Sequence, residues 1–68
     1  MNRQLFLQGT GTIDVDATDY ELTKLMLTDA DAVTDWSKAL PVIKELSASY
    51  GAAKAVCMVI NARRELQA

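Results

Sequence analysis

The sequence predicts an α+β fold, in which an N-terminal β-hairpin packs on two to three helices and the last helix is strongly apolar. Three observations support this prediction. Residues 3–16 carry two β-like segments around a Gly-Thr-Gly turn, residues 33–50 carry an apolar stripe at helical spacing, and residues 52–62 are almost entirely apolar. Because the chain has 68 residues, we expect a single small domain, residues 1–68.

The hairpin is predicted from a period of two. Residues 3–8 form the first apolar segment, and within residues 12–16 Ile13 and Val15 alternate with acidic residues. Residues 9–11, Gly-Thr-Gly, lie between them and tolerate the positive φ of a tight turn. Two strands alone are barely stable in water, so we expect the hairpin to lie on the helices or to extend a sheet with a second copy.

Residues 19–27 are predicted to form a short helix. Thr18 and Glu21 match a capping box, in which the hydroxyl and the carboxylate each accept a hydrogen bond from an unpaired backbone amide. Apolar residues from Leu22 to Met26 then form a stripe. A third strand is the alternative, because Tyr20, Leu22 and Met26 also fit a period of two.

A long amphipathic helix is predicted next, because apolar residues recur every three or four positions from Val33 to Tyr50. Pro41 lies inside this pattern and lacks a backbone amide, so we expect a kink or a break near Leu40. Gly51 then offers a left-handed cap that ends the helix.

The last helix is predicted from Ala52 to about Gln67, with only Lys54 and Asn61 as polar residues in its first three turns. Such a helix is normally buried in a larger protein, and a short chain has little material to surround it. We therefore expect a homodimer in which a second copy covers the far side of this helix. The expected self-association residues are Val56, Val59 and Ile60.

The side-chain inventory argues against several functions. With no His and a single Cys, the chain cannot form an internal disulfide, and we expect no metal site. Nucleophilic catalysis lacks its usual general base, and so small a chain has little volume for a substrate pocket. We therefore expect no enzyme, no catalytic residues, no cofactor and no small-molecule substrate.

Two short motifs fail at decisive positions. Residues 14–18 place oxygens as a calcium loop does, but Asp19 stands at its glycine position and Leu25 at its bidentate glutamate. Residues 9–12 begin like a dinucleotide fingerprint but lead into a β-like segment rather than a helix.

The location is predicted to be cytoplasmic. The apolar runs of the chain are all far shorter than the roughly 18 residues that a membrane span requires. Residues 1–13 lack the apolar stretch and the cleavage site of a signal peptide. A lone Cys57 agrees with a reducing compartment and is interpreted as a small hydrophobic residue.

Charge is distributed unevenly, with +1 in residues 1–13, −6 in residues 14–35 and +3 in residues 36–68. Nucleic-acid binders instead carry one basic face, which argues against nucleic acid as the partner. Two interpretations of the carboxylates in the middle segment are open. They either form a solvated face and lie at the starts of helices, or they form a patch that docks on a basic protein surface. The residues of this predicted patch are Asp14, Asp16, Asp19, Glu21, Asp29, Asp31 and Asp35.

Residues 42–61 resemble a helix-turn-helix, particularly that of LacI-type repressors, with the small Ser47 four positions before the turn glycine, Gly51, and an Ile-Asn ending. The resemblance implies that the second helix enters the major groove of DNA. Its exposed positions would be Ala53, Lys54, Ala55, Met58, Val59 and Ala62. Only Lys54 among them can hydrogen-bond a base or a phosphate.

The leading prediction is a small non-enzymatic protein that acts through protein–protein interaction, as a regulator, an inhibitor or an assembly factor. The alternative, implied by the resemblance, is a DNA-binding regulator that uses residues 42–64. Its phosphate contacts would be Lys54, Arg63 and Arg64.

Overall fold

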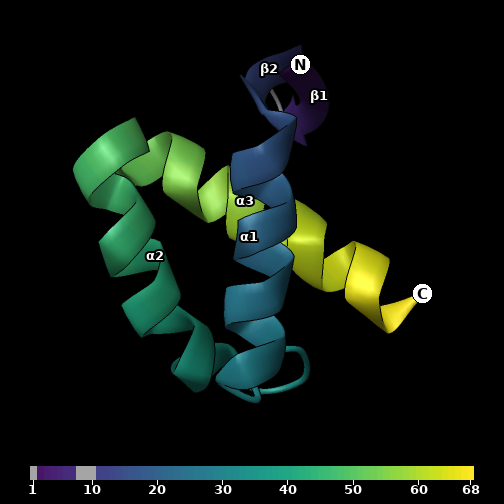
Figure 1. Cartoon of the computed structure of the whole chain (residues 1–68), viewed down its shortest axis with the longest axis vertical. Helices are drawn as coiled ribbons and strands as arrows, with labels where there is room; N and C mark the ends of the chain where they lie inside the picture. The colour runs from purple at the N-terminus through teal and green to yellow at the C-terminus, as the bar shows by residue number, and fades with distance from the viewer. Residues whose placement is uncertain (1, 8–10) are drawn as a thin grey trace.

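The computed structural model of the protein describes residues 2–7 and 11–68. Two strands, β1 (Asn2–Leu7) and β2 (Gly11–Asp16), precede three helices, α1 (Ala17–Asp29), α2 (Trp36–Tyr50) and α3 (Ala52–Gln67). Figure 1 shows the hairpin at one end of α1, with α3 starting beside the end of α2 and passing behind α1. The predicted α+β fold is confirmed, while residues 9 and 10 of the predicted turn lie outside the described residues.

The hairpin is antiparallel and rests on the helices. Its register places Arg3 opposite Val15 and Leu5 opposite Ile13, so these four residues share one face. Leu5 and Val15 are buried on that face, whereas Gln4 on the other face is exposed. The alternation confirms the predicted period of two. It also confirms the first of the two expected arrangements, in which the hairpin lies on the helices.

Helix α1 follows β2 directly. The predicted helix is therefore confirmed, and the alternative of a third strand is wrong. The predicted capping box, however, is wrong. Asp16 is the N-cap: its Oδ1 accepts hydrogen bonds from the amides of Thr18 at 2.8 Å and Asp19 at 3.2 Å. Aspartate caps helices at least as well as threonine does, and the extended backbone of Asp16 lets the strand lead straight into the helix.

Helix α2 continues through Pro41, so of the kink or break expected near Leu40 the break is wrong. Its N-cap, Asp35, accepts hydrogen bonds from the amide of Ser37 at 3.1 Å and from its hydroxyl at 2.6 Å. Pro41 is exposed and lies early in the helix, where the one carbonyl that loses an amide partner belongs to the exposed Ser37 and can bind water.

Gly51 alone separates α2 from α3. Its φ of +83° is strained for any residue with a Cβ, which explains the glycine at this position. The Gly51 amide donates to the Ser47 carbonyl at 2.9 Å and closes α2, while its own carbonyl accepts the amide of Ala55 at 3.0 Å and opens α3. The positive φ of the predicted cap is therefore confirmed.

The core is built around α3, which packs on α2, α1 and β1. Its buried side chains are Ala55, Cys57, Met58, Val59 and Ala62. They meet Leu5 and Val15 from the hairpin, Tyr20 and Leu27 from α1, and Ala39 and Val42 from α2. None of the helices in the described part of the chain combines the length and hydropathy of a membrane span.

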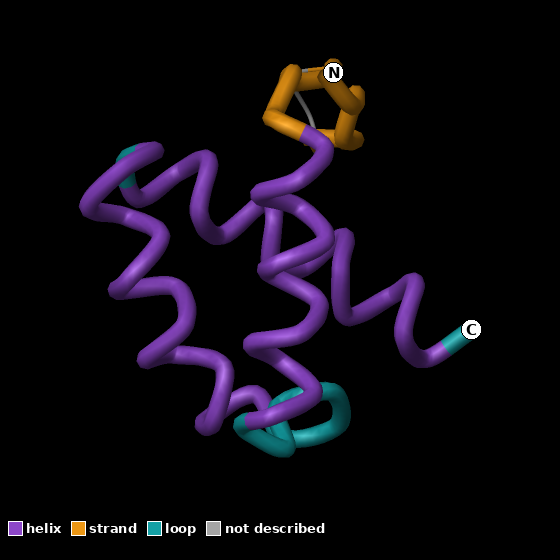
Figure 2. Tube along the Cα trace, viewed as in Figure 1, coloured by secondary structure: helices purple, strands orange, loops and turns teal. Residues whose placement is uncertain are grey.

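The connection between α1 and α2, drawn as loop in Figure 2, is fixed by the end of α3. Arg63 Nε donates to the Ala32 carbonyl at 3.1 Å, and Gln67 Nε2 donates to the Val33 carbonyl at 2.7 Å. The Arg63 guanidinium also lies 5.0 Å from the centre of the Trp36 ring. These contacts hold the start of α2 against α3.

A polar cluster around Glu65 joins the hairpin, α1 and α3. Glu65 Oε1 lies 2.8 Å from Arg3 Nη2 and 3.1 Å from Lys24 Nζ, and Glu65 Oε2 accepts a hydrogen bond from the Tyr20 hydroxyl. The Arg3 guanidinium also covers the Tyr20 ring at 4.6 Å from its centre. Burial raises the pKa of Glu65, but the hydrogen bonds from Tyr20, Lys24 and Arg3 outweigh it and leave the pKa lowered.

The N-cap of α1 gives a stability prediction. Replacing an N-cap aspartate by alanine leaves two amides without a side-chain acceptor, so we expect Asp16→Ala to lower the free energy of unfolding by about 1 kcal/mol. Urea denaturation measures the change. Asp14→Ala is the matched control, because Asp14 is exposed on the same strand and caps no helix, and an equal loss in both variants would contradict the assignment of the cap.

The lowered pKa of Glu65 gives a pH prediction. A carboxyl whose pKa is lower in the folded protein contributes stability that is complete above its ordinary pKa of about 4.3 and is lost as the pH falls through the folded pKa. We expect Glu65→Gln to be about 1 kcal/mol less stable than the wild type at neutral pH, because this partly exposed carboxylate is screened by solvent. Below about pH 4 the difference should narrow.

Urea titrations at several pH values test this prediction, with Glu45→Gln as the control, because Glu45 is an exposed glutamate outside the cluster. A difference between Glu65→Gln and the wild type that stays constant down to acid pH would contradict it.

Candidate functional site

The two faces of α1 are used in an unexpected way. The predicted apolar stripe of this helix, Leu22, Leu25 and Met26, is not part of the fully buried core: Leu22 is 49% exposed, Leu25 is 59% exposed, and Met26 is half-buried and packs against the core. The fully buried face of α1 consists instead of Tyr20, Thr23 and Leu27. Helix α1 therefore has one face in the core and a second, more apolar face turned toward solvent.

The two hydroxyl groups on the buried face of α1 both have hydrogen-bond partners. The Tyr20 hydroxyl donates to Glu65, and Thr23 Oγ1 donates to the Asp19 carbonyl at 2.9 Å within the same helix. A buried hydroxyl that has a partner costs little, so Tyr20 and Thr23 can occupy the core. The stripe expected to be buried is consequently the one that remains accessible.

The accessible face of α1 looks onto α2 across an open groove. The two helices run in opposite directions, and both pack on α3, which passes behind α1 (Figure 1). We call this feature the α1/α2 groove. From α1 it is lined by Asp19, Leu22, Met26, Asp29 and Ala30. From α2 it is lined by Pro41, Val42, Glu45, Leu46, Ser49 and Tyr50.

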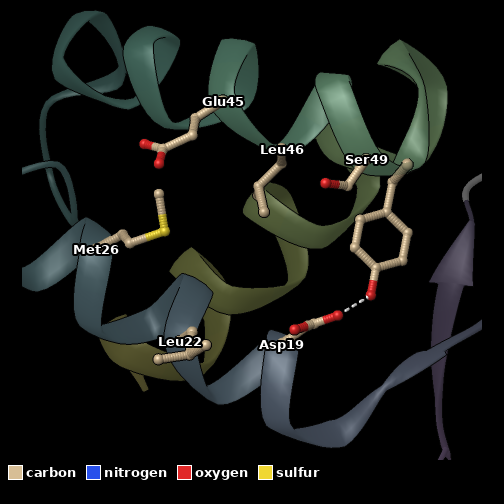
Figure 3. Close-up of a pocket in the computed structure, with 7 residues that line it drawn as sticks. Asp19, Leu22, Met26, Glu45, Leu46 and Ser49 are labelled. Carbon is tan, nitrogen blue, oxygen red and sulfur yellow. Dashed lines mark hydrogen bonds between the residues drawn. The ribbon is translucent and has the colours of Figure 1, made fainter.

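The groove consists of two hollows that share Met26 and Glu45 as lining residues. The hollow beside Tyr50 has a volume of about 180 Å³, and the one beside Pro41 about 380 Å³. Figure 3 shows Leu22, Met26 and Leu46 projecting from the two helices into the first hollow. A pair of joined hollows along two helices suits a linear binding partner better than one compact small molecule.

One end of the groove is closed by a hydrogen bond between the helices, drawn as a dashed line in Figure 3. The Tyr50 hydroxyl donates to Asp19 Oδ2. This bond, together with burial, raises the pKa of Tyr50, because ionising the phenol would lose the bond and place two negative charges together.

The sides of the groove are acidic. Asp29 and Glu45 line the hollow beside Pro41, and within the described part of the chain neither makes an ion pair. Among the described residues that line either hollow, none is Lys or Arg. The groove therefore combines an apolar floor with uncompensated negative charge.

The seven carboxylates of the predicted acidic patch do not lie together. Asp14, Asp16 and Asp19 lie at the start of α1, whereas Asp29, Asp31 and Asp35 lie at or beyond its end. A helix of 13 residues is about 20 Å long, so these two groups are well separated. Glu21, the seventh, lies 3.8 Å from Arg3 and 3.4 Å from Lys24, which both also bind Glu65. Only Asp19 and Asp29 of the seven line the groove.

The residues predicted for self-association are partly used within the chain. Val59 is fully buried in the core, while Val56 and Ile60 are half-buried. Self-association through α3 stays a prediction, and in this structure its contacts would rest on Val56 and Ile60.

The positions that the helix-turn-helix resemblance places in a DNA groove lie mostly in the core. Ala55, Met58, Val59 and Ala62 are buried, and of the six positions only Ala53 and Lys54 are exposed. Among the three predicted phosphate contacts, Lys54 and Arg64 are exposed, whereas Arg63 is held by the Ala32 carbonyl and the Trp36 ring.

Chemistry outside the groove is sparse. Among the residues that the structure describes, no three His, Cys, Asp or Glu side chains gather closely enough to hold a metal ion. Cys57 is buried in α3, and burial raises the pKa of its thiol, which makes it a poor nucleophile. Comparisons with family models, with curated proteins and with solved structures found no match.

The groove residues on α2, Glu45 and Leu46 above all, were not predicted as a site from the sequence. One signal could have indicated it: α1 carries apolar residues on two faces, at 20 and 27 and again at 22, 25 and 26, which is more than one contact with a core requires.

The Tyr50–Asp19 hydrogen bond gives a titration prediction. Because it raises the pKa of Tyr50, the stability it contributes is complete below the ordinary tyrosine pKa of about 10 and is lost as the pH rises through the folded pKa. We expect Asp19→Asn to shift the ionisation of Tyr50 back toward that ordinary value.

Ultraviolet absorbance of the phenolate follows this titration, and the component lost in Tyr50→Phe identifies Tyr50. Asp29→Asn, at the other end of the same helix, is the control and should leave the Tyr50 titration unchanged. An unchanged titration in Asp19→Asn would show that the bond does not govern this end of the groove.

Proposed function

We propose that this protein is not an enzyme and acts by binding another protein, with the α1/α2 groove as its binding surface. One observation carries the proposal: the more apolar face of α1 is turned away from the core, with Leu22 and Leu25 about half exposed or more. Exposed apolar side chains that gather beside a groove are typical of interaction sites, whereas single scattered ones are not.

The energy available from this face supports the proposal. Fully burying an exposed leucine side chain contributes about 1.5–3 kcal/mol, and Leu22, which lines the groove and is 49% exposed, supplies part of that amount in a complex. A micromolar complex needs roughly 8 kcal/mol in total, after the cost of association has been met. The groove is therefore suited to a regulated, reversible contact, as expected of a regulator, an inhibitor or an assembly factor.

We also propose a cytoplasmic location, on the sequence grounds given above. For the helix-turn-helix alternative, the burial of most of the expected recognition face of α3 leaves no observation that favours it.

Affinity capture from an extract of the source cell, with matched leucine variants as bait, tests the proposal. Leu22→Asp places a charge in the groove, whereas Leu40→Asp places one at a leucine of similar exposure, 52%, outside the groove. Both sites are on the surface, so the stability of each variant should change by less than about 0.5 kcal/mol, which circular dichroism during thermal unfolding checks.

We expect the wild type and Leu40→Asp to retain the same partner, and Leu22→Asp to lose it by at least about tenfold, because a buried, unpaired carboxylate disrupts an apolar contact. Equal capture by all three proteins would contradict the groove as the binding surface.

A further inference from the structure

The occupant of the α1/α2 groove follows from its shape and charge. We propose that it is an amphipathic helix of the partner protein, with Lys or Arg residues beside its apolar face. This inference rests on the proposed function, and it adds the chemical class of the bound segment.

The dimensions of the groove fit one helix. Its walls run from Asp19 to Ala30 and from Pro41 to Tyr50, so they are about 17 and 14 Å long. A partner helix of about three turns would span this length and present anchors at positions i, i+3 or i+4, and i+7. Leu22, Met26 and Leu46 provide the apolar surface that such anchors would contact.

The backbone of the walls favours a helix over an extended segment. Both walls are α-helices, in which backbone amides and carbonyls are already paired within the helix. An extended peptide lying between them would find no strand edge to pair with and would gain no backbone hydrogen bonds from the walls. A helix satisfies its own backbone and requires only side-chain contacts.

The charge of the groove favours basic residues on that helix. Asp29 from α1 and Glu45 from α2 line the same hollow from opposite walls, without an ion pair to any described residue. Lys44 precedes Glu45 in the sequence but does not line either hollow. Cationic side chains on both flanks of a bound helix would therefore meet a carboxylate on each side.

The same charges disfavour a second copy of this chain as the occupant. A two-fold symmetric dimer places the same patch of both subunits face to face. Such a dimer through the groove would bring Asp29 and Glu45 of both subunits into one interface that has no Lys or Arg among its described lining residues, and like charges at an interface are repulsive. A basic partner relieves the repulsion that a second copy would increase.

Designed peptides test the inference on the full-length protein. The probe is a helical peptide of Leu and Lys with an apolar stripe at i, i+3, i+4 and i+7. Two controls accompany it: the same peptide with Glu in place of Lys, and a scrambled Leu/Lys peptide that keeps the charge but loses the stripe. Binding is followed by amide chemical shifts of the protein at low and moderate salt.

We expect the Leu/Lys helix to shift resonances around Leu22, Met26 and Leu46, and to bind at least about tenfold more tightly than the Glu peptide and the scrambled peptide. The double variant Asp29→Asn/Glu45→Gln should weaken this binding about five- to tenfold and reduce its salt dependence. Asp14→Asn, on the hairpin outside the groove, should leave the affinity unchanged.

Equal affinity for the Lys and Glu peptides, or shifts confined to other surfaces, would overturn the basic helix as the occupant. So would groove shifts that grow with protein concentration in the absence of peptide, because they would identify a second copy as the occupant. Either result is compatible with the proposed function, in which another protein binds in the groove. That proposal has its own test, and it fails if Leu22→Asp captures the same partner as the wild type.

Discussion

Five side chains of α3 are buried, and the hairpin, α1 and α2 together have to supply the surface that covers them. In a chain of 68 residues this requirement governs how every other element is placed. Helices α1 and α2 both turn a face onto α3, and the hairpin covers it through Leu5 and Val15. Glu65, near the end of α3, fixes this arrangement because its carboxylate binds Arg3 of β1 and Tyr20 of α1 together.

The open groove is a consequence of that packing. Helix α1 contributes Tyr20 and Leu27 to the core, and α2 contributes Ala39 and Val42, of which Val42 also lines the groove. At one end the Tyr50 hydroxyl bonds Asp19 and links the two helices. Along the rest of their length the second faces of the helices are left facing a shared space, and this space is the α1/α2 groove.

The sequence predicts the hairpin, the three helices and the turn at Gly51, because each rests on a local pattern: a period of two, a stripe of three and four, or a positive φ. The orientation of α1 is not predictable in this way. A helical period reveals an apolar face, but α1 has two, and the choice of the Tyr20 face depends on Glu65, which lies 45 residues away in the chain. The groove was missed for the same reason, since it exists only once that choice is made.

The acidic sides of the groove can be understood from the cost of leaving an apolar face uncovered. Exposed leucines beside a hollow favour unwanted self-association, which most small domains avoid by keeping such patches small or charged. Asp29 and Glu45 flank the apolar floor and oppose the pairing of two grooves by like-charge repulsion. In the proposed role the same carboxylates attract a basic helix, so one feature both discourages the wrong partner and selects the right one. A variant that neutralises them should therefore lose selectivity before it loses stability.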